Sequence, residues 1–387
     1  MKMSEAVEGG KNEELTSARR TPLDDAHRRA GALLREQDGR VVPAHYGDAS
    51  AEYEAVRGGG GAGLFDLSSR GRVEVSGAEA VQFLNGMLTN DVAKLEDGAW
   101  MSAAFPNVQG RLIAPARVTR RGDRFVFDTE PATHERMLKS LERFTPAGDF
   151  RVRDLTSETA MLSLQGAGAA QLVAAVLGED ASRVGRGRVS SATFRTSDVN
   201  VMRATHTAED GFDLTTGADG AEALWDALVA AGARPAGFDA LEVLRVEAGL
   251  PRYGVDATEA NVVLEVVDEA EAVSYTKGCY VGQEIIARIH WRGHVAKRLA
   301  GLVLAREVDA PTAAQLKSCD DAREVGRVTS TVYSPRLRRF VALGLVKYDY
   351  LKPGTEVKVF VGDEELCAAH VAELPLVRGS WYAGDDR

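Results

Sequence analysis

A short segment near residue 280 holds the side chains best suited to chemistry. Cys279 stands between Gly278 and Gly282, in the run Thr-Lys-Gly-Cys-Tyr-Val-Gly-Gln-Glu at 276–284. Glycine has no side chain to cover the sulfur, and Lys277 is followed by arginines and histidines as far as His294. A thiol in positive surroundings ionises more readily and is reactive or able to bind a metal. The alternative is a structural cysteine in a tight turn, since free cysteines are among the most buried residues. The pattern alone leaves both readings open.

Other potential ligands follow this segment. His290 and His294 are four residues apart, a spacing that places two side chains on one face of a helix. Gly293 lies between them and argues against a helix there, so we predict no metal site. Cys319 and Cys367 form no C-x-x-C pair with Cys279, which argues against a disulfide framework and a structural zinc site. We expect both to be structural.

Composition sets the broad class of the protein. The chain has 387 residues, a hydrophobic fraction of 44% and a net charge of −10. This length predicts two or three domains. The negative charge disfavours direct binding to nucleic acid or to an anionic membrane. No stretch approaches the ~20 apolar residues that a membrane span needs. No secretory signal is visible either. With three scattered cysteines, the sequence predicts a soluble protein of a reducing compartment, the cytoplasm.

Patterning divides the chain into three parts. Residues 1–40 are rich in charge and poor in large apolar side chains, which predicts a disordered tail with a short helix over 23–34. Residues 41–296 mix strands and helices without regular βαβ alternation, which favours an α+β fold. Short strands separated by turns over 297–380 predict a small β-barrel. The glycine run at 58–63 matches G-x-G-x-x-G, but a helical segment precedes it and a strand follows, the reverse of a dinucleotide-binding fingerprint.

Several segments together resemble the glycine-cleavage T-protein (aminomethyltransferase) superfamily over residues 42–378. They are residues 63–68, 83–85 with 88–91, 209–212, 244–249, and 326–330 with Ser334-Pro335. The resemblance implies a folate-binding domain of two related α+β halves followed by a C-terminal β-barrel. Residues 277–284 resemble the signature of the YgfZ group. Those are folate-binding proteins linked to iron–sulfur cluster assembly or repair and, through iron–sulfur enzymes, to tRNA thiomodification.

The departures from this superfamily concern its catalytic and pterin-binding residues. Aminomethyltransferases carry two adjacent aspartates where this chain has Ala114 and Pro115. Losing a general acid or base costs roughly two to four orders of magnitude in rate, so we expect no active aminomethyltransferase. The glutamate that contacts the pterin corresponds to Asp213, the tyrosine before it to His206, and a basic loop arginine to Leu241.

The resemblance therefore implies an accessory protein in iron–sulfur cluster assembly or repair, with tetrahydrofolate bound and iron–sulfur assembly or client proteins as partners. The expected active groups are Cys279 and Lys277. The residues expected to bind the cofactor are Asp213, His206, Arg245, Gln283, Glu284 and Arg288. Two alternatives remain. One is a folate-dependent aminomethyltransferase or other one-carbon transfer enzyme, which Ala114 and Pro115 oppose. The other is a folate-responsive scaffold, in which replacing Cys279 would have no effect.

Overall fold

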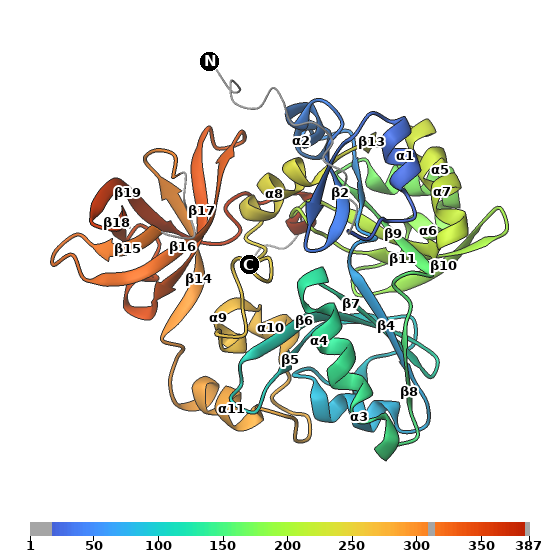
Figure 1. The fold of residues 1–387 in the computed structure, drawn as a ribbon, viewed down its shortest axis with the longest axis horizontal. Helices are drawn as coiled ribbons and strands as arrows, with labels where there is room; N and C mark the ends of the chain where they lie inside the picture. The colour runs from blue at the N-terminus through green and yellow to red at the C-terminus, as the bar shows by residue number, and fades with distance from the viewer. Residues whose placement is uncertain (1–17, 309–313, 384–387) are drawn as a thin grey trace.

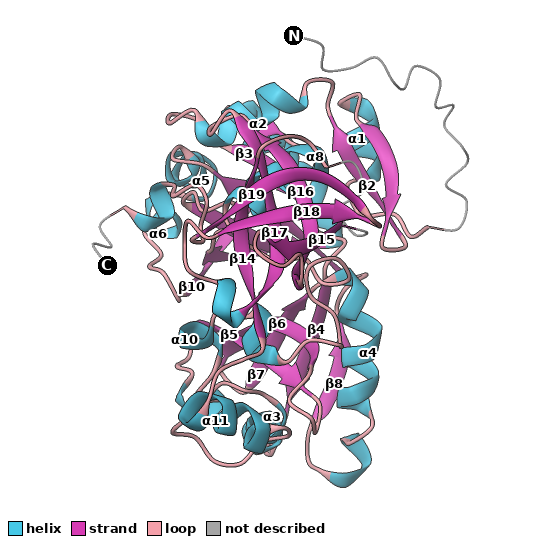
Figure 2. Cartoon of the chain, turned by 90° about the vertical axis from the view of Figure 1, so that its left-hand side faces the viewer, coloured by secondary structure: helices cyan, strands magenta, loops and turns pink. Residues whose placement is uncertain are grey.

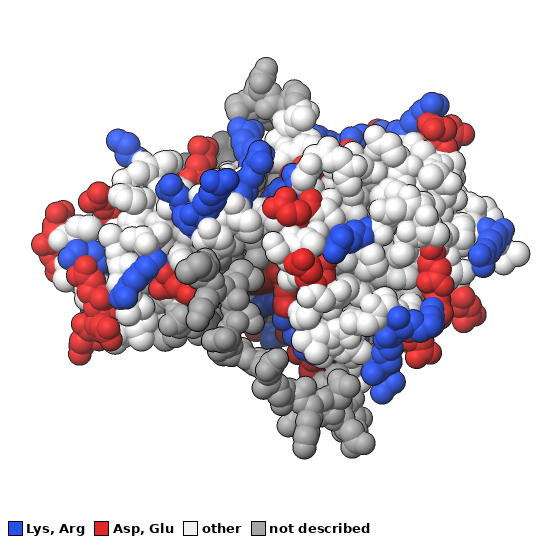
Figure 3. Space-filling model, turned by 90° about the horizontal axis from the view of Figure 1, so that it is seen from above, with Lys and Arg blue, Asp and Glu red and all other residues white. Residues whose placement is uncertain are grey.

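The computed structural model describes residues 18–308 and 314–383, which form two sheet-and-helix units and a barrel around a common centre (Figure 1). Figure 2 shows the same chain from the side of the barrel, with the five-stranded sheet below it. On the face shown in Figure 3, the coloured side chains are of both signs, interspersed rather than gathered in one continuous patch.

The N-terminal segment is ordered from residue 18 onward. Helix α1 (Asp24–Arg29) is followed by the hairpin of β1 (Leu33–Gln37) and β2 (Arg40–His45). His27 is buried and joins Asp66 through Nε2 at 2.9 Å and the Tyr46 hydroxyl through Nδ1 at 2.8 Å. The prediction of disorder up to residue 40 is therefore wrong for residues 18–40, because a few buried side chains anchor this charged segment. Residues 1–17 lie outside the described part.

The first large sheet has six strands in the order β10-β11-β12-β9-β3-β13. Its strands are β3 (Gly63–Asp66), β9 (Thr159–Gln165), β10 (Val189–Phe194), β11 (Ser197–Arg203), β12 (Gly211–Gly217) and β13 (Arg234–Pro235). Helices α5 (Ala169–Leu177), α6 (Glu179–Ser182) and α7 (Ala218–Ala230) belong to the same unit. Its core is apolar, with Trp225, Phe212 and Leu164 buried at the centre.

The second sheet has five strands in the order β5-β6-β7-β4-β8. Its strands are β4 (Gly71–Ser76), β5 (Trp100–Pro106), β6 (Leu112–Arg121), β7 (Arg124–Thr129) and β8 (Arg151–Asp154). Helices α3 (Ala80–Met87) and α4 (Pro131–Glu142) contribute to its separate core, through Leu84, Met137 and Leu141. Along β6, buried residues alternate with partly exposed ones from Leu112 to Val118, as expected for a strand with one face in a core.

Helices α2 (Ala49–Arg57) and α8 (Phe238–Glu247) pack on each other, and α8 also contacts the barrel strands β16 and β17. Glu247 at the end of α8 accepts hydrogen bonds from the Tyr53 hydroxyl at 2.8 Å, Arg57 at 3.0 Å and the Ser334 hydroxyl at 2.5 Å. It is fully buried, so these three partners compensate for its lost hydration. Helix α8 thereby joins the first unit to the barrel.

Three short helices, α9 (Val263–Val266), α10 (Glu269–Ala272) and α11 (Gln283–Arg292), lead to the barrel. The barrel closes in the order β14-β17-β16-β15-β18-β19. Its strands are β14 (Lys297–Leu304), β15 (Ala314–Ser318), β16 (Glu324–Ser334), β17 (Arg339–Lys347), β18 (Glu356–Val361) and β19 (Glu364–Ala372). The predicted fold class, an α+β domain of two halves followed by a β-barrel, is confirmed. Within the described ranges, no helix is long and apolar enough to cross a membrane.

Candidate functional site in a central hollow

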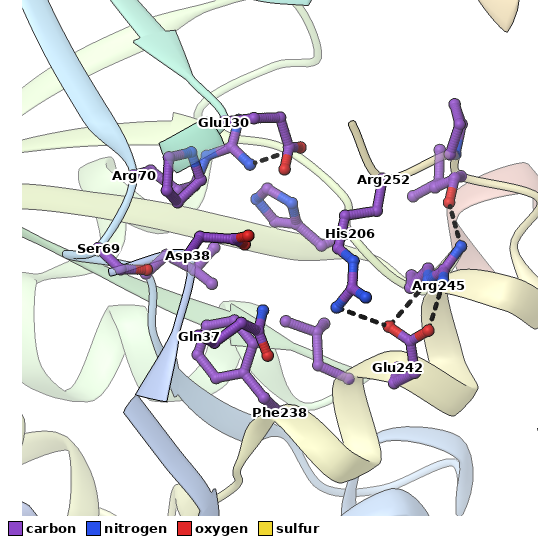
Figure 4. A pocket seen from close by; sticks show the side chains of 15 residues that line it. Gln37, Asp38, Ser69, Arg70, Glu130, His206, Phe238, Glu242, Arg245 and Arg252 are labelled. Carbon is purple, nitrogen blue, oxygen red and sulfur yellow. Dashed lines mark hydrogen bonds and ion pairs between the residues drawn. The ribbon is translucent and has the colours of Figure 1, made fainter. Parts of the chain in front are cut away.

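A hollow opens where the N-terminal hairpin, both large sheets and α8 meet (Figure 4). We call it the inner hollow. Its empty volume, including the part open to solvent, is about 680 Å³. Its lining is mixed: apolar walls carry a few converging charges, as in many ligand sites. The residues are Gln37, Asp38, Leu67, Ser69, Arg70, Glu130, Pro131, His206, Phe238, Leu241, Glu242, Arg245, Leu250, Pro251 and Arg252.

Two of its arginines are tied to carboxylates. Arg70 donates to Asp128 at 2.6 Å and to Glu130 at 3.1 Å. Burial opposes its charge, but the two carboxylates outweigh burial and raise the pKa of Arg70 above its ordinary value. Arg245 binds Glu242 and, at 2.5 Å, Asp256. These guanidinium groups shape the walls and stay charged at any working pH.

Beneath the floor lies a buried ionic cluster. His206 lies with Nε2 2.9 Å from Oδ2 of Asp213, and Arg117 on β6 donates to the same oxygen at 2.9 Å. Arg117 also donates to the Thr205 carbonyl oxygen at 2.8 Å. Asp213 is only 1% exposed. Burial would raise its pKa, but His206 and then Arg117 lower the pKa of Asp213 to about 2. Asp213 is therefore a carboxylate at neutral pH.

His206 belongs to both the cluster and the hollow. Burial lowers the pKa of His206 below its ordinary value, more than the neighbouring Asp213 raises it. At neutral pH the imidazole is therefore uncharged. Nε2 faces the Asp213 carboxylate at 2.9 Å and Nη1 of Arg117 at 3.1 Å, and a proton on Nε2 suits only the contact with the carboxylate. In this tautomer Nδ1 is the acceptor. A neutral imidazole oriented by a carboxylate is able to take up a proton from a reacting group.

The hollow adjoins a second one on the outside of α8, which we call the outer hollow. The two share Gln37, Glu242 and Arg252 in their linings. The outer hollow lies between the hairpin, α2 and α8 on one side and Val332, Tyr333 and Pro335 of the barrel on the other.

The two expected active groups, Cys279 and Lys277, lie away from both hollows. Lys277 is buried, and its ammonium group donates to the carbonyl oxygens of Leu88 at 2.8 Å and Asn90 at 2.7 Å. Burial lowers the pKa of Lys277 to about 8. Cys279 is exposed. Neither residue lines the inner hollow. Lys277 holds the loop after α3, and the structure does not bring it to the thiol chemistry that we expected.

The other residues of this segment that we expected to act, Gln283, Glu284 and Arg288, lie on the surface helix α11. Gln283 and Glu284 begin this helix after Gly282, whose φ of 77° is left-handed. Arg288 forms an exposed ion pair with Glu284 at 2.7 Å, one turn away. A Cβ at Gly282 would lie 2.3 Å from the Asn107 carbonyl oxygen. This glycine therefore allows α11 to pack closely against the turn between β5 and β6.

Of the residues expected to bind a cofactor, His206 and Arg245 line the inner hollow, and Asp213 lies behind His206. Gln283, Glu284 and Arg288 do not line it. Sequence reasoning missed Asp38, Arg70, Arg117, Glu242 and Arg252. Of these, only Arg117 could have been found from the sequence, because it lies two residues after Pro115 and therefore on the same face of the strand. Asp38 comes from a hairpin tip, Arg70 and Arg252 come from loops, and Glu242 lies on α8, and no short motif reveals the direction of these side chains.

No potential metal site is found in the part of the chain that the structure describes. It contains no group of three or more histidine, cysteine, aspartate or glutamate side chains placed to hold a metal ion. His290 stacks on Tyr275 and hydrogen-bonds Glu269, whereas His294 stacks on Tyr348 beyond the end of α11. The two histidines thus contact different neighbours.

Two sheet-and-helix units and a closed barrel surround the hollow, an arrangement shared with the two domain families and the solved structure that match this chain. The chain belongs to the glycine cleavage T-protein family: residues 23–267 match the GCVT N-terminal domain, and residues 297–378 match the glycine cleavage T-protein C-terminal barrel domain. The superfamily resemblance seen in the sequence is confirmed.

Individual relatives agree over nearly the whole length. The chain is 34% identical to the aminomethyltransferase of Rubrobacter xylanophilus, covering 93% of this chain and 94% of the relative. It is also 34% identical to an aminomethyltransferase of Thermus thermophilus, covering 85% of this chain and 91% of the relative. The crystal structure of glycine cleavage system aminomethyltransferase T from Bartonella henselae superposes with a TM-score of 0.83 at 26% identity, covering 94% of this chain and 99% of that one.

These relatives correct the functional prediction. The expected role in iron–sulfur cluster assembly or repair is wrong, because proteins similar over most of the chain are aminomethyltransferases. The finer assignment to the YgfZ group, with its iron–sulfur partners and its link to tRNA modification, has no support in these relatives. What the comparisons favour is the alternative, a folate-dependent aminomethyltransferase or other one-carbon transfer enzyme.

Tetrahydrofolate, the one-carbon acceptor that this family uses, fits the hollow in part. The apolar walls formed by Leu67, Phe238 and Leu241 suit a flat ring system. Asp213 does not suit the pterin-binding role expected of it. Its carboxylate is buried behind His206 and is hydrogen-bonded to Arg117. A pterin placed as expected from the sequence would have to displace Arg117 first.

Proposed function

We propose that this protein is a one-carbon transfer enzyme that uses tetrahydrofolate and works in the inner hollow. One observation carries the proposal: the chain corresponds to aminomethyltransferases along almost their whole length, in both domains. The hollow supports it, because it lies where both sheet units and α8 meet and combines apolar walls with titratable groups.

His206 is the residue we propose as proton acceptor. When the carbon passes to a folate nitrogen, the new C–N bond forms as the bond from this carbon to the donor nitrogen breaks. The donor leaves as a free amine, and the folate nitrogen releases its proton. His206 lines the hollow, is held neutral by burial, and is oriented by Asp213 at 2.9 Å. Arg117 in turn keeps Asp213 ionised. This chain therefore offers a base from the floor of the hollow, whereas Ala114 and Pro115 on β6 have no titratable group.

The donor of the carbon differs, in our proposal, from the aminomethyl group handled by the named relatives. Ala114 is buried and Pro115 pairs with Ala104 inside the sheet. We expect aminomethyl transfer to run roughly 10²- to 10⁴-fold slower than in a relative with an acidic residue there, the usual cost of a missing acid–base group.

A turnover assay tests the proposal. The purified protein is incubated with tetrahydrofolate and a panel of small N-methyl amines as donors, with N-aminomethyl amines for comparison, and formation of the one-carbon-substituted folate is followed by chromatography. We expect folate-dependent turnover with at least one small donor, and its loss in His206→Asn. The matched control is His370→Asn on β19, which should keep full activity. Calorimetric titration with tetrahydrofolate provides a separate readout. No heat of binding at millimolar folate and no folate product from any donor would refute the proposal.

A further inference from the structure

Two opposite charges face the mouth of the inner hollow without touching each other. Asp38 extends into it from the tip of the β1–β2 hairpin, and Arg252 extends from the loop after α8 (Figure 4). Partial burial and the Glu130 carboxylate raise the pKa of Asp38, whereas Arg252 acts to lower it, so the charges of Asp38 and Arg252 are close enough to interact. No ion pair within 4.0 Å joins the two side chains. A gap thus separates an anion from a cation.

The Asp38 carboxylate is free to accept hydrogen bonds. Within residues 18–308 and 314–383, no side chain or backbone group donates to it. Asp38 and Gly39 have φ angles of 51° and 74°, the left-handed pair that forms a tight two-residue hairpin turn. This turn fixes the direction of the side chain. The hairpin itself is held on α8 by the ion pair of Arg35 with Asp239.

Arg252 has donors to spare. A guanidinium group carries five N–H donors. In the described part of the chain, its only ion pair is with Glu242 at 3.4 Å, and that carboxylate is already bound by Arg245. The Arg252 side chain is 30% exposed. Its backbone N–H donates to Asp256 at 3.0 Å, which fixes the loop. The guanidinium is therefore held in place but not saturated.

The wall beside the two charges is apolar, with Phe238, Leu241 and Leu250 lining the hollow. A ligand with a single charge would satisfy one residue and leave the other unpaired at the edge of this wall. A small molecule with an ammonium group at one end and a carboxylate at the other would satisfy both. Each contact would be a charge-assisted hydrogen bond, the stronger kind.

We propose that the mouth of the inner hollow binds a small zwitterion of the amino-acid type, with its ammonium group on Asp38 and its carboxylate on Arg252. The proposal rests on the proposed function, in which this ligand is the one-carbon donor. It names the class of donor: a free N-substituted amino acid rather than a protein-bound aminomethyl group.

Binding is tested by calorimetry in the absence of folate, with N-methylglycine as the probe. Propionate lacks the ammonium group and N-methylethylamine lacks the carboxylate. We expect the wild-type protein to bind N-methylglycine at least tenfold more tightly than either analogue. Asp38→Asn, which keeps a residue suited to the left-handed turn, should bind N-methylglycine no better than propionate. Arg252→Gln should bind it no better than N-methylethylamine.

Two matched variants control for general charge effects. Glu36→Gln removes an exposed carboxylate two residues before Asp38, and Arg323→Gln removes an exposed guanidinium in the barrel. Both should bind N-methylglycine as the wild type does. The proposal is overturned if wild type shows no binding at tens of millimolar N-methylglycine. Equal affinity in wild type, Asp38→Asn and Arg252→Gln would overturn it as well.

The outcomes separate this proposal from the proposed function. If N-methylglycine binds as described but no donor yields a folate product, one-carbon transfer fails and the zwitterion site stands. If a folate product forms only from donors that lack one of the two charges, one-carbon transfer stands and the zwitterion site fails.

Discussion

Replacing Arg117 by alanine is the sharpest test of the ionic cluster beneath the hollow. The change removes the guanidinium that donates to Asp213 at 2.9 Å and to the Thr205 carbonyl oxygen at 2.8 Å. It leaves a carboxylate that is 1% exposed, with the uncharged His206 ring and the Ser163 hydroxyl as its remaining hydrogen-bonding neighbours. We expect the variant to fold but to be clearly less stable.

The size of the loss follows from two estimates. Breaking a buried ion pair by removing one partner typically costs about 3–5 kcal/mol. Arg117 is 19% exposed and His206 stays in place, so the lower end applies. Separately, the pKa of Asp213 lies at about 2 instead of 3.8, a difference that corresponds to about 2 kcal/mol shared by all the partners of this carboxylate. We therefore expect Arg117→Ala to lose about 2–3 kcal/mol at pH 7.

The pH dependence has a defined sign. A carboxyl group whose pKa is lowered by folding stabilises the protein above its unfolded pKa, and this contribution is lost as the pH falls from about 4 toward 2. The difference in stability between wild type and Arg117→Ala should therefore be full at pH 7 and should shrink below pH 4.

Urea denaturation followed by tryptophan fluorescence measures the loss, since Trp100 lies beside Arg117. The control is Arg124→Ala, because Arg124 is 61% exposed and lies 3.5 Å from Glu74. That change should cost less than about 1 kcal/mol. The double variant Arg117→Ala/Asp213→Asn should recover part of the loss, because it removes the unpaired charge. Wild-type stability in Arg117→Ala, or a further loss in the double variant, would refute the cluster as described.

Three further outcomes are expected. In urea denaturation, Lys277→Met should lose about 2 kcal/mol of unfolding free energy, because the two carbonyl oxygens that its ammonium group binds lose their donor. The control Lys94→Met changes a side chain that is 69% exposed and should alter stability little. Equal effects of the two changes would contradict the buried hydrogen bonds of Lys277. Native protein treated with a thiol reagent should react rapidly at Cys279 and slowly at the buried Cys367, whereas protection of Cys279 would show that this segment is covered. Arg245→Leu should lose about 3–5 kcal/mol of unfolding free energy, since it removes the ion-pair partner of Asp256, which is fully buried. A loss below about 1 kcal/mol in urea denaturation would be inconsistent with this ion pair.

Elements with a clear periodicity were predictable from the sequence. The mixed strands and helices predicted over 41–296 correspond to the two sheet units with their helices, and the short strands predicted over 297–380 form the barrel from β14 to β19. The hairpin of β1 and β2 was missed, because a disordered tail was predicted over most of it. These strands carry polar residues, and tertiary packing rather than local pattern holds them in place.

The site was harder to predict than the fold. His206 and Arg245 were found because they align with family motifs, and both line the inner hollow. Cys279, expected as the active thiol, is exposed and lines neither hollow. Lys277 instead points to backbone carbonyl groups. Asp38 could not have been found, since only the folded hairpin brings a turn residue to a hollow built by α8.

Helix α8 has a consequence for how ligands influence one another. It contributes Glu242 to both hollows, and its last residue, Glu247, hydrogen-bonds Ser334 of the barrel. An occupant of one hollow that changes the position of Glu242 changes the energy of filling the other. By linkage the effect is reciprocal: each ligand alters the affinity of its neighbour by the same factor. Affinities measured with one ligand at a time would then differ from those that apply during turnover.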